Sequence, residues 1–83
     1  SQYAQITEDS FSLDFKENGY SSFWAKECPL LWNLFEYLSN CHLKSIVIKE
    51  CSFYEKELKY IVALLKGNAT SLLHLEFWYV NFS

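Results

Sequence analysis

The sequence predicts an α/β fold with the element order β-α-β-α-β, in which a small parallel sheet carries its helices on one face. Two observations support this fold class. The segments that begin at Leu43 and Leu72 both follow the pattern L-x-x-L-x-L, whose alternating apolar positions are typical of a strand. An amphipathic helix pattern lies between them, and two parallel strands need a crossover of this kind.

The spacing of the two segments predicts a repeat. They begin 29 residues apart, from Leu43 to Leu72, which is at the upper end of the lengths of leucine-rich repeats. Cys51 follows the first segment at the place where such repeats have Asn or Cys. The predicted unit is therefore leucine-rich-repeat-like.

Length and composition bound the domain organisation. The chain has 83 residues, of which 51% are hydrophobic and 20% charged, and this excludes disorder and allows one domain at most. The composition is rich in apolar residues for a domain of this size, which buries only about 60–65% of its unfolded surface. We expect residues 1–83 to be a single repeat segment of a longer protein.

The first strand is predicted near the N-terminus. Residues 1–9 show little pattern and are expected to lead into it. Residues 10–18 alternate between apolar and polar side chains, which puts Phe11, Leu13 and Phe15 on one face of a strand.

The same stretch fits a degraded repeat frame, in which Leu13 takes the position that Ile46 has in the next repeat. Asn18–Gly19 is predicted to end the strand, because Gly adopts the left-handed backbone of tight turns at no steric cost. Residues 20–28 would then connect the strand to the first helix.

The first helix is predicted to begin at Pro29, where the missing N–H of proline costs nothing. It would end at Ser39–Asn40. Its apolar face has the spacing i, i+3, i+4, i+7. The face consists of Leu31, Leu34, Phe35 and Leu38.

The second strand, residues 43–49, and the helix after it form the clearest part of the pattern. Ser52 and Glu55 have the spacing of a capping box, which predicts the start of the helix. Gly67 is predicted as the residue after its last turn. The apolar face of this helix is expected to consist of Leu58, Ile61, Val62 and Leu65.

The last strand, from Leu72 to about Tyr79, would be an exposed apolar edge, so we expect another repeat, a cap or a partner to cover it. Alternation divides the strands into two faces. The core face is expected to hold Leu13, Phe15, Ile46, Ile48, Leu75 and Phe77. The open face is expected to hold Ser12, Asp14, Lys16, Ser45, Val47, Lys49, His74, Glu76 and Trp78.

The open face holds the candidate binding residues, because a Trp amid mixed charge is the composition of a recognition surface. The alternative is that Trp78 packs on a following repeat. The candidate protein-binding face is Ser45, Val47, Lys49, His74, Glu76 and Trp78.

No arrangement of residues predicts an enzyme or a cofactor. The spacing of Cys41, His42, Cys51 and His74 matches no zinc pattern and suggests no catalytic pair. The three cysteines are expected to be reduced, as in an intracellular protein of the cytoplasm or nucleus. The pattern N-x-S/T occurs at Asn68 and Asn81, but glycosylation would need a secreted chain.

Charge and hydropathy exclude two classes of partner. A net charge of −3 argues against binding nucleic acid or an anionic membrane through bulk charge. No run of 18 apolar residues is present, so no transmembrane helix is expected. We therefore expect a protein partner.

From Leu43 onward the chain resembles the FBD domain, the C-terminal domain of plant F-box proteins with leucine-rich repeats. The likeness covers about residues 40–77. The residues that carry it are Leu43–Ile48, Glu57–Val62, Leu64–Lys66, Asn68–Ala69 and Leu72.

The resemblance implies a part of an SCF-type ubiquitin ligase that binds the ubiquitination target. It implies no catalytic residue. A Skp-type adaptor would bind through an F-box that is absent from this segment. The alternative is a leucine-rich-repeat segment of an intracellular immune receptor or scaffold protein.

Overall fold

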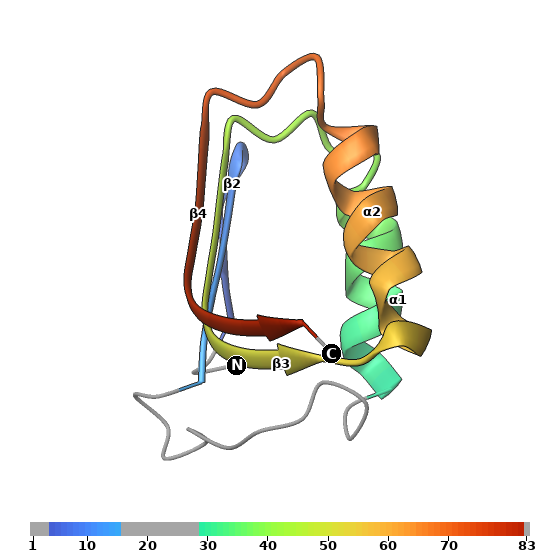
Figure 1. The fold of residues 1–83 in the computed structure, drawn as a ribbon. Coiled ribbons are helices and arrows are strands. Elements are labelled where there is room, and N and C mark those ends of the chain that lie inside the picture. The colour runs from blue at the N-terminus through green and yellow to red at the C-terminus, as the bar shows by residue number, and fades with distance from the viewer. Residues whose placement is uncertain (1–3, 16–28, 83) are drawn as a thin grey trace.

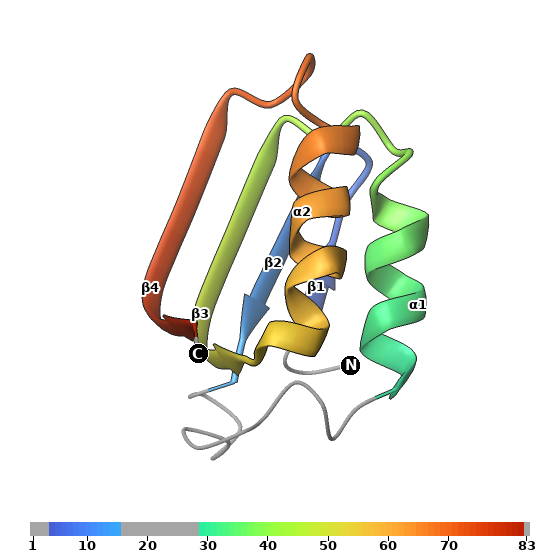
Figure 2. The ribbon, with the colours of Figure 1, turned by 45° about the vertical axis from the view of Figure 1, so that its right-hand side comes forward.

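The structure is a computed structural model that describes residues 4–15 and 29–82 (Figure 1). Four strands form one open sheet in the order β1-β2-β3-β4, and both helices cover the same face of it (Figures 1 and 2). The predicted α/β class is confirmed. The elements are β1 (Ala4–Ile6), β2 (Ser10–Asp14), α1 (Pro29–Leu38), β3 (Ser45–Phe53), the 3₁₀ helix η3 (Glu55–Glu57), α2 (Leu58–Gly67) and β4 (His74–Phe82).

The sheet is mixed rather than wholly parallel. Strands β2, β3 and β4 run parallel as predicted, whereas β1 pairs antiparallel with β2. The N-terminal residues were expected only to lead into a strand, and this was wrong. A turn brings β1 back onto β2, and in it the Thr7 N–H donates to the Ser10 carbonyl at 2.9 Å. A strand of three residues is too short to show a period of two.

The observed pairing of β2 with β3 differs from the repeat frame that was predicted for residues 10–18. Leu13 pairs with Ile48, and Phe11 pairs with Ile46. The frame had placed Leu13 opposite Ile46, which is a slip of two residues. A slip of two keeps every side chain on its face, so Phe11, Leu13 and Phe15 are buried as predicted.

Some expectations lie outside the residues that the structure describes. They are the strand end at Asn18–Gly19, the connector of residues 20–28, and the positions of Lys16 and Cys28. Within the described helices, neither α1 nor α2 is long and apolar enough to cross a membrane.

The helices bury most of the predicted faces. Helix α1 buries Leu31, Phe35 and Leu38, as its spacing predicted. Helix α2 is rotated from the predicted face, because it buries Ile61 and Leu64 and leaves Val62 exposed.

The predicted capping box at the start of α2 is wrong. Strand β3 continues to Phe53, so Ser52 has a strand backbone and makes no helix cap. The chain enters the helix through η3 after Tyr54, without a side-chain cap hydrogen bond at either helix start. The C-terminal prediction also changes, because Gly67 is the last helical residue and Asn68 is the cap.

Strands β3 and β4 bend sharply at matching positions (Figure 1). Glu50 in β3 and Tyr79 in β4 have φ of 55° and 54°, in the left-handed region. The left-handed backbone at Glu50 shifts the alternation of β3 by one residue, so Cys51 and Phe53 are buried after the bend. The Phe53 and Phe82 rings stack with centroids 5.8 Å apart. The bent ends thereby close one end of the core.

The core-facing side chains of β4 are not buried, which corrects their assignment to the core. Leu75 is 44% exposed and Phe77 is 37% exposed. Their register partners in β3, Ile46 and Ile48, are both 0% exposed. The difference arises because β4 is the edge strand and lies beyond α2 (Figure 2).

This difference predicts unequal costs for two equivalent substitutions. Ile46→Ala should cost about 3–4 kcal/mol, since it leaves a cavity in a closed core. Leu75→Ala should cost about 1 kcal/mol or less, since half of its side chain already meets water. Urea unfolding of both variants measures the two losses of stability. Equal losses would show that β4 is covered in the isolated chain.

Candidate protein-binding face

The register brings the six candidate residues together on the face of the sheet opposite the helices. Three pairs adjoin across β3 and β4, because paired residues of parallel strands point to the same side. Ser12 and Asp14 of β2 extend the same face, opposite Val47 and Lys49. The pairs are Ser45 with His74, Val47 with Glu76, and Lys49 with Trp78.

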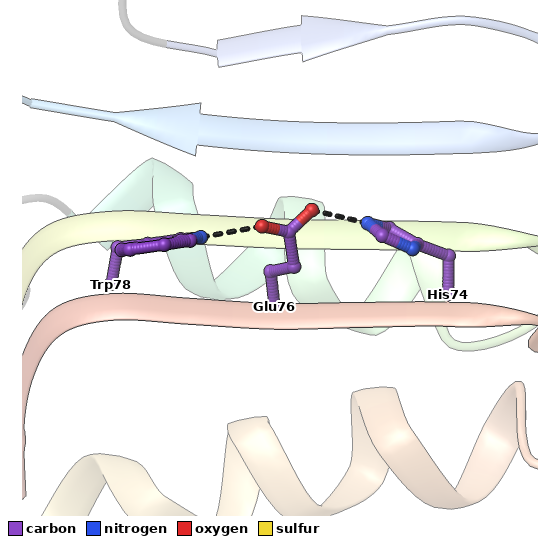
Figure 3. Close-up of polar contacts among 3 residues, drawn as sticks. All are labelled: His74, Glu76 and Trp78. Atoms are coloured by element: carbon purple, nitrogen blue, oxygen red, sulfur yellow. Dashed lines mark hydrogen bonds and ion pairs between the residues drawn. The ribbon is translucent and has the colours of Figure 1, made fainter.

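His74, Glu76 and Trp78 form a hydrogen-bonded row along β4 (Figure 3). The Trp78 Nε1–H donates to Glu76 Oε1 at 2.5 Å. The second carboxylate oxygen of Glu76 contacts His74 Nε2. The three side chains lean from β4 across β3 (Figure 3). One carboxylate therefore fixes the orientation of both rings.

These contacts lower the pKa of the Glu76 carboxyl. The largest cause is the hydrogen bond from Trp78, followed by the bond to His74, and the electrostatic interactions with His74 and Lys49 lower the pKa further. Hydrogen bonds to the charged form favour ionisation. Glu76 is therefore an anion at neutral pH.

The lowered pKa predicts how the row responds to acid. The stabilisation from the hydrogen bonds to Glu76 is fully present above the pKa that Glu76 has in the unfolded chain. It is lost as the pH falls through the lower pKa that Glu76 has in the folded chain. The Trp78 indole N–H resonance should therefore shift below pH ~4.3, the ordinary Glu value. A proton NMR titration measures this, and Glu76→Gln should abolish the step. A step that persists in Glu76→Gln would assign it to another group.

A pocket of about 200 Å³ adjoins the row at the strand bend. It is lined by Asp14, Lys49, Glu50, Trp78 and Tyr79. Sequence reasoning missed Glu50 and Tyr79, because simple alternation puts neighbouring residues on opposite faces. The left-handed backbone at Tyr79 breaks the alternation. The aromatic run that includes Trp78 and Tyr79 was the sequence feature that could have indicated a pocket here.

Cysteine chemistry and a metal site gain no support within the described residues. Burial raises the pKa of the Cys51 thiol to about 12, so it is not a thiolate at neutral pH. The Cys41 thiol donates to the Tyr37 carbonyl at 3.4 Å. In residues 4–15 and 29–82, no group of three or more Cys, His, Asp or Glu residues could hold a metal ion.

The first glycosylation pattern is explained by structure. The Asn68 side chain is 0% exposed and makes three hydrogen bonds to backbone groups. A buried, fully bonded amide cannot accept a glycan in the folded chain. Asn81 is exposed in β4, and Ser83, which completes its pattern, lies outside the described residues.

Comparison with known proteins assigns no family. No family model matches the sequence, and neither a curated protein nor a solved structure is significantly similar to it. The resemblance of residues 40–77 to the FBD domain therefore stays a prediction from the sequence.

Proposed function

We propose that the chain is a protein-recognition unit of the leucine-rich-repeat type, and that its open sheet face binds a protein partner. The observation that carries the proposal is Trp78, which is 49% exposed and held in place by Glu76 at the mouth of a pocket. A preoriented, half-exposed Trp is the kind of residue that dominates protein interfaces.

The match between β3 and β4 supports the repeat part of the proposal. The two predicted frames lie in register, with Ile48 opposite Phe77 and Cys51 opposite Val80. The bends at Glu50 and Tyr79 also coincide. The same local structure therefore occurs at the same step of two successive strands.

The loops before the strands repeat a backbone hydrogen-bond pattern. The Asp9 carbonyl accepts from the N–H groups of Lys44 and Ser45 at 2.7 and 3.2 Å. The Lys44 carbonyl accepts from the N–H groups of Leu73 and His74 at 2.8 and 3.0 Å. In each loop, one carbonyl accepts from two N–H groups at the start of the next strand. The pattern occurs in two successive loops, as in a stacked array of repeats.

The FBD resemblance supplies the biological setting of the proposal: the substrate-binding region of an F-box protein in an SCF-type ubiquitin ligase. Its matching residues include the buried Leu43, Ile46, Leu64 and Asn68, so the likeness concerns the folding framework and implies no chemistry. The free thiols of Cys41 and Cys51 support an intracellular location.

Co-purification tests this setting. The full-length protein should recover a Skp-type adaptor and a cullin when it is isolated from its native cells. If both are absent from repeated isolations, the F-box setting is wrong. Binding of another protein to the open face would still stand.

Trp78→Ala tests the binding face. It should weaken the binding of the partner by about 2 kcal/mol or more, roughly thirtyfold, as expected for a hot-spot residue. It should cost less than about 2 kcal/mol of folding stability, because half of the side chain is already exposed. Calorimetric titration and urea unfolding measure the two effects.

The matched control is Tyr37→Ala on α1, where another aromatic side chain is exposed on the helical side of the molecule. It should leave binding unchanged. A stability loss above about 3 kcal/mol in Trp78→Ala would place Trp78 in the core. Equal effects of the two variants on binding would refute the face.

A further inference from the structure

We infer that a second copy of this chain pairs with the outer edge of β4, so that the two sheets join around a twofold axis at Leu75. Strand β4 ends the sheet, and no other described segment lies along its outer edge (Figure 2). The inference goes beyond the proposed function and does not depend on it, because it concerns the edge of the sheet rather than its open face.

The outer edge of β4 presents backbone groups at alternate residues. The His74 N–H donates to the Lys44 carbonyl at the entry to β3, at 3.0 Å, so the backbone of His74 faces β3. Consecutive residues of a strand direct their backbone groups to opposite edges, and those of Leu75 and Phe77 therefore face outward. Within residues 4–15 and 29–82, no strand pairs with this edge. Such an edge is a template for the addition of another strand.

Strand β4 lacks the features that protect edge strands from pairing. Strand β1, at the opposite edge, has only three residues, and a very short strand is a poor template. Strand β4 has nine residues, with neither Lys nor Pro among them. The long, unprotected edge is therefore the one at β4. An edge that pairs with its own copy closes a dimer, whereas pairing of one edge with the other would build a fibre.

Apolar side chains lie along the same edge. Leu75 and Phe77, on the helix side of β4, stay partly exposed, and Leu73, just before the strand, is 83% exposed. An antiparallel copy with its axis at Leu75 sets Leu75 beside Leu75 and Phe77 beside Leu73 of the other chain. The pairing would thus remove from water the apolar surface that the fold of one chain leaves uncovered.

The charges and the bend select this register. Paired side chains must share a face, so within the straight part of β4, residues 74–78, the axis passes through Leu75, Glu76 or Phe77. An axis at Glu76 would set two carboxylates opposite each other in a close pair, which is destabilising. An axis at Phe77 would pair Leu75 with Tyr79, where a φ of 54° bends the strand. The axis at Leu75 avoids both conflicts.

The order of charges along the edge is complementary to itself in this register. His74 of each copy lies opposite Glu76 of the other, and the two carboxylates are kept apart. The contact between His74 and Glu76 within each chain stays intact and lies beside the reversed pair of the copy. The pairing needs no free group on Glu76, because backbone hydrogen bonds at Leu75 and apolar contacts hold it.

A ladder this short predicts a weak dimer, with a Kd of about 0.1 mM. Half of the chains would then be paired at a total concentration equal to the Kd. At the micromolar concentrations of an unfolding experiment the chain is monomeric, and the cost expected for Leu75→Ala is unchanged.

Disulfide crosslinking tests the register. Leu75→Cys is placed in a chain that also carries Cys28→Ser and Cys41→Ser, and the remaining Cys51 is buried. In the proposed register the new thiol meets its own copy in a hydrogen-bonded pair, where a Cα separation of about 5.5 Å suits a disulfide. Mild oxidation should therefore give a covalent dimer, which mass spectrometry detects.

Two further variants in the same background are the controls. Phe77→Cys lies opposite Leu73 in the proposed register, and Tyr37→Cys on α1 reports chance collisions. Leu75→Cys should crosslink at least about tenfold faster than either. Equal rates for Leu75→Cys and Tyr37→Cys, or faster crosslinking of Phe77→Cys, would overturn the inference. Crosslinking of Leu75→Cys to a different protein but not to its copy would also overturn it.

Sedimentation equilibrium tests the dimer without crosslinking. The mass of the unmodified protein should rise from one chain to two across about 0.1 mM. Leu75→Lys should weaken the pairing by at least about tenfold, since an edge Lys blocks strand addition. Val62→Lys, at an exposed position of α2, should leave it unchanged. A monomer at all concentrations up to about 1 mM, or a mass that grows beyond two chains, would contradict the closed dimer.

Discussion

Gly67→Ala should destabilise the protein by about 3 kcal/mol, although the same change in an ordinary helix stabilises it by ~1 kcal/mol. Gly67 is the last residue of α2, and its φ lies outside the left-handed region. A Cβ there would lie 1.9 Å from the carbonyl oxygen of Ser39 and 2.8 Å from its carbonyl carbon. Backbone atoms cannot rotate away, so the ends of the two helices must separate. Forced overpacking typically costs 1–3 kcal/mol, and a backbone clash belongs at the upper end.

Urea unfolding of Gly67→Ala measures this loss. The control is Lys66→Ala, one residue earlier on the exposed side of α2, which should change stability by less than about 0.5 kcal/mol. A neutral or stabilising effect of Gly67→Ala would show that the helix ends do not pack this closely. The sign of the effect thus separates close packing from helix propensity.

Asn68→Ala should cost about 4 kcal/mol, because one buried side chain joins three parts of the fold. Asn68 Oδ1 accepts from the Leu43 N–H at 2.8 Å. Its Nδ2 donates to the carbonyls of Leu38 and Leu64 at 3.0 and 2.8 Å. The contacts join the end of α1, the end of α2 and the entry to β3. Each buried group left without a partner costs about 1–3 kcal/mol.

Asn68→Asp is the isosteric control for this prediction. It keeps the acceptor for Leu43 but places a carboxylate oxygen against two carbonyls that need a donor. At neutral pH it should be at least as destabilising as Asn68→Ala, since a buried charge then lacks a partner. Thermal unfolding measures both variants. An Asp variant as stable as the unmodified chain would refute the role of the amide donors.

Residues with strong periodicity were predictable from the sequence. The faces of β2, β3 and α1 follow from repeated apolar spacings, because several residues in each element report the same period. Helix α2 was predicted less well, since apolar side chains surround much of it and Leu64 competes with Val62 for the core. Strand β1 depends on pairing with β2, which local sequence does not encode.

The roles of Gly67 and Asn68 depended on tertiary contacts. Both residue types are common at helix ends for local reasons, and the sequence therefore predicted Gly67 only as the residue after the last turn of the helix. The structure assigns Gly67 to a close approach with Ser39 and Asn68 to three long-range or capping bonds. Neither contact is visible until α1 and α2 lie side by side.

The candidate face was predictable because it needs only alternation and register. Its six residues lie together once β3 and β4 pair in the frame that both sequences share. The pocket was not predictable, since it depends on left-handed backbone at Glu50 and Tyr79. Neither residue type is a usual sign of such a conformation.

Covalent footprinting of the complex with the protein partner tests the central claim most directly. Hydroxyl radicals oxidise exposed aromatic and imidazole side chains, and mass spectrometry locates them. Binding should protect His74 and Trp78 on the open face and leave Tyr37 on α1 as reactive as in the free protein. Protection of Tyr37 with unchanged oxidation of His74 and Trp78 would place the partner on the helices and contradict the account.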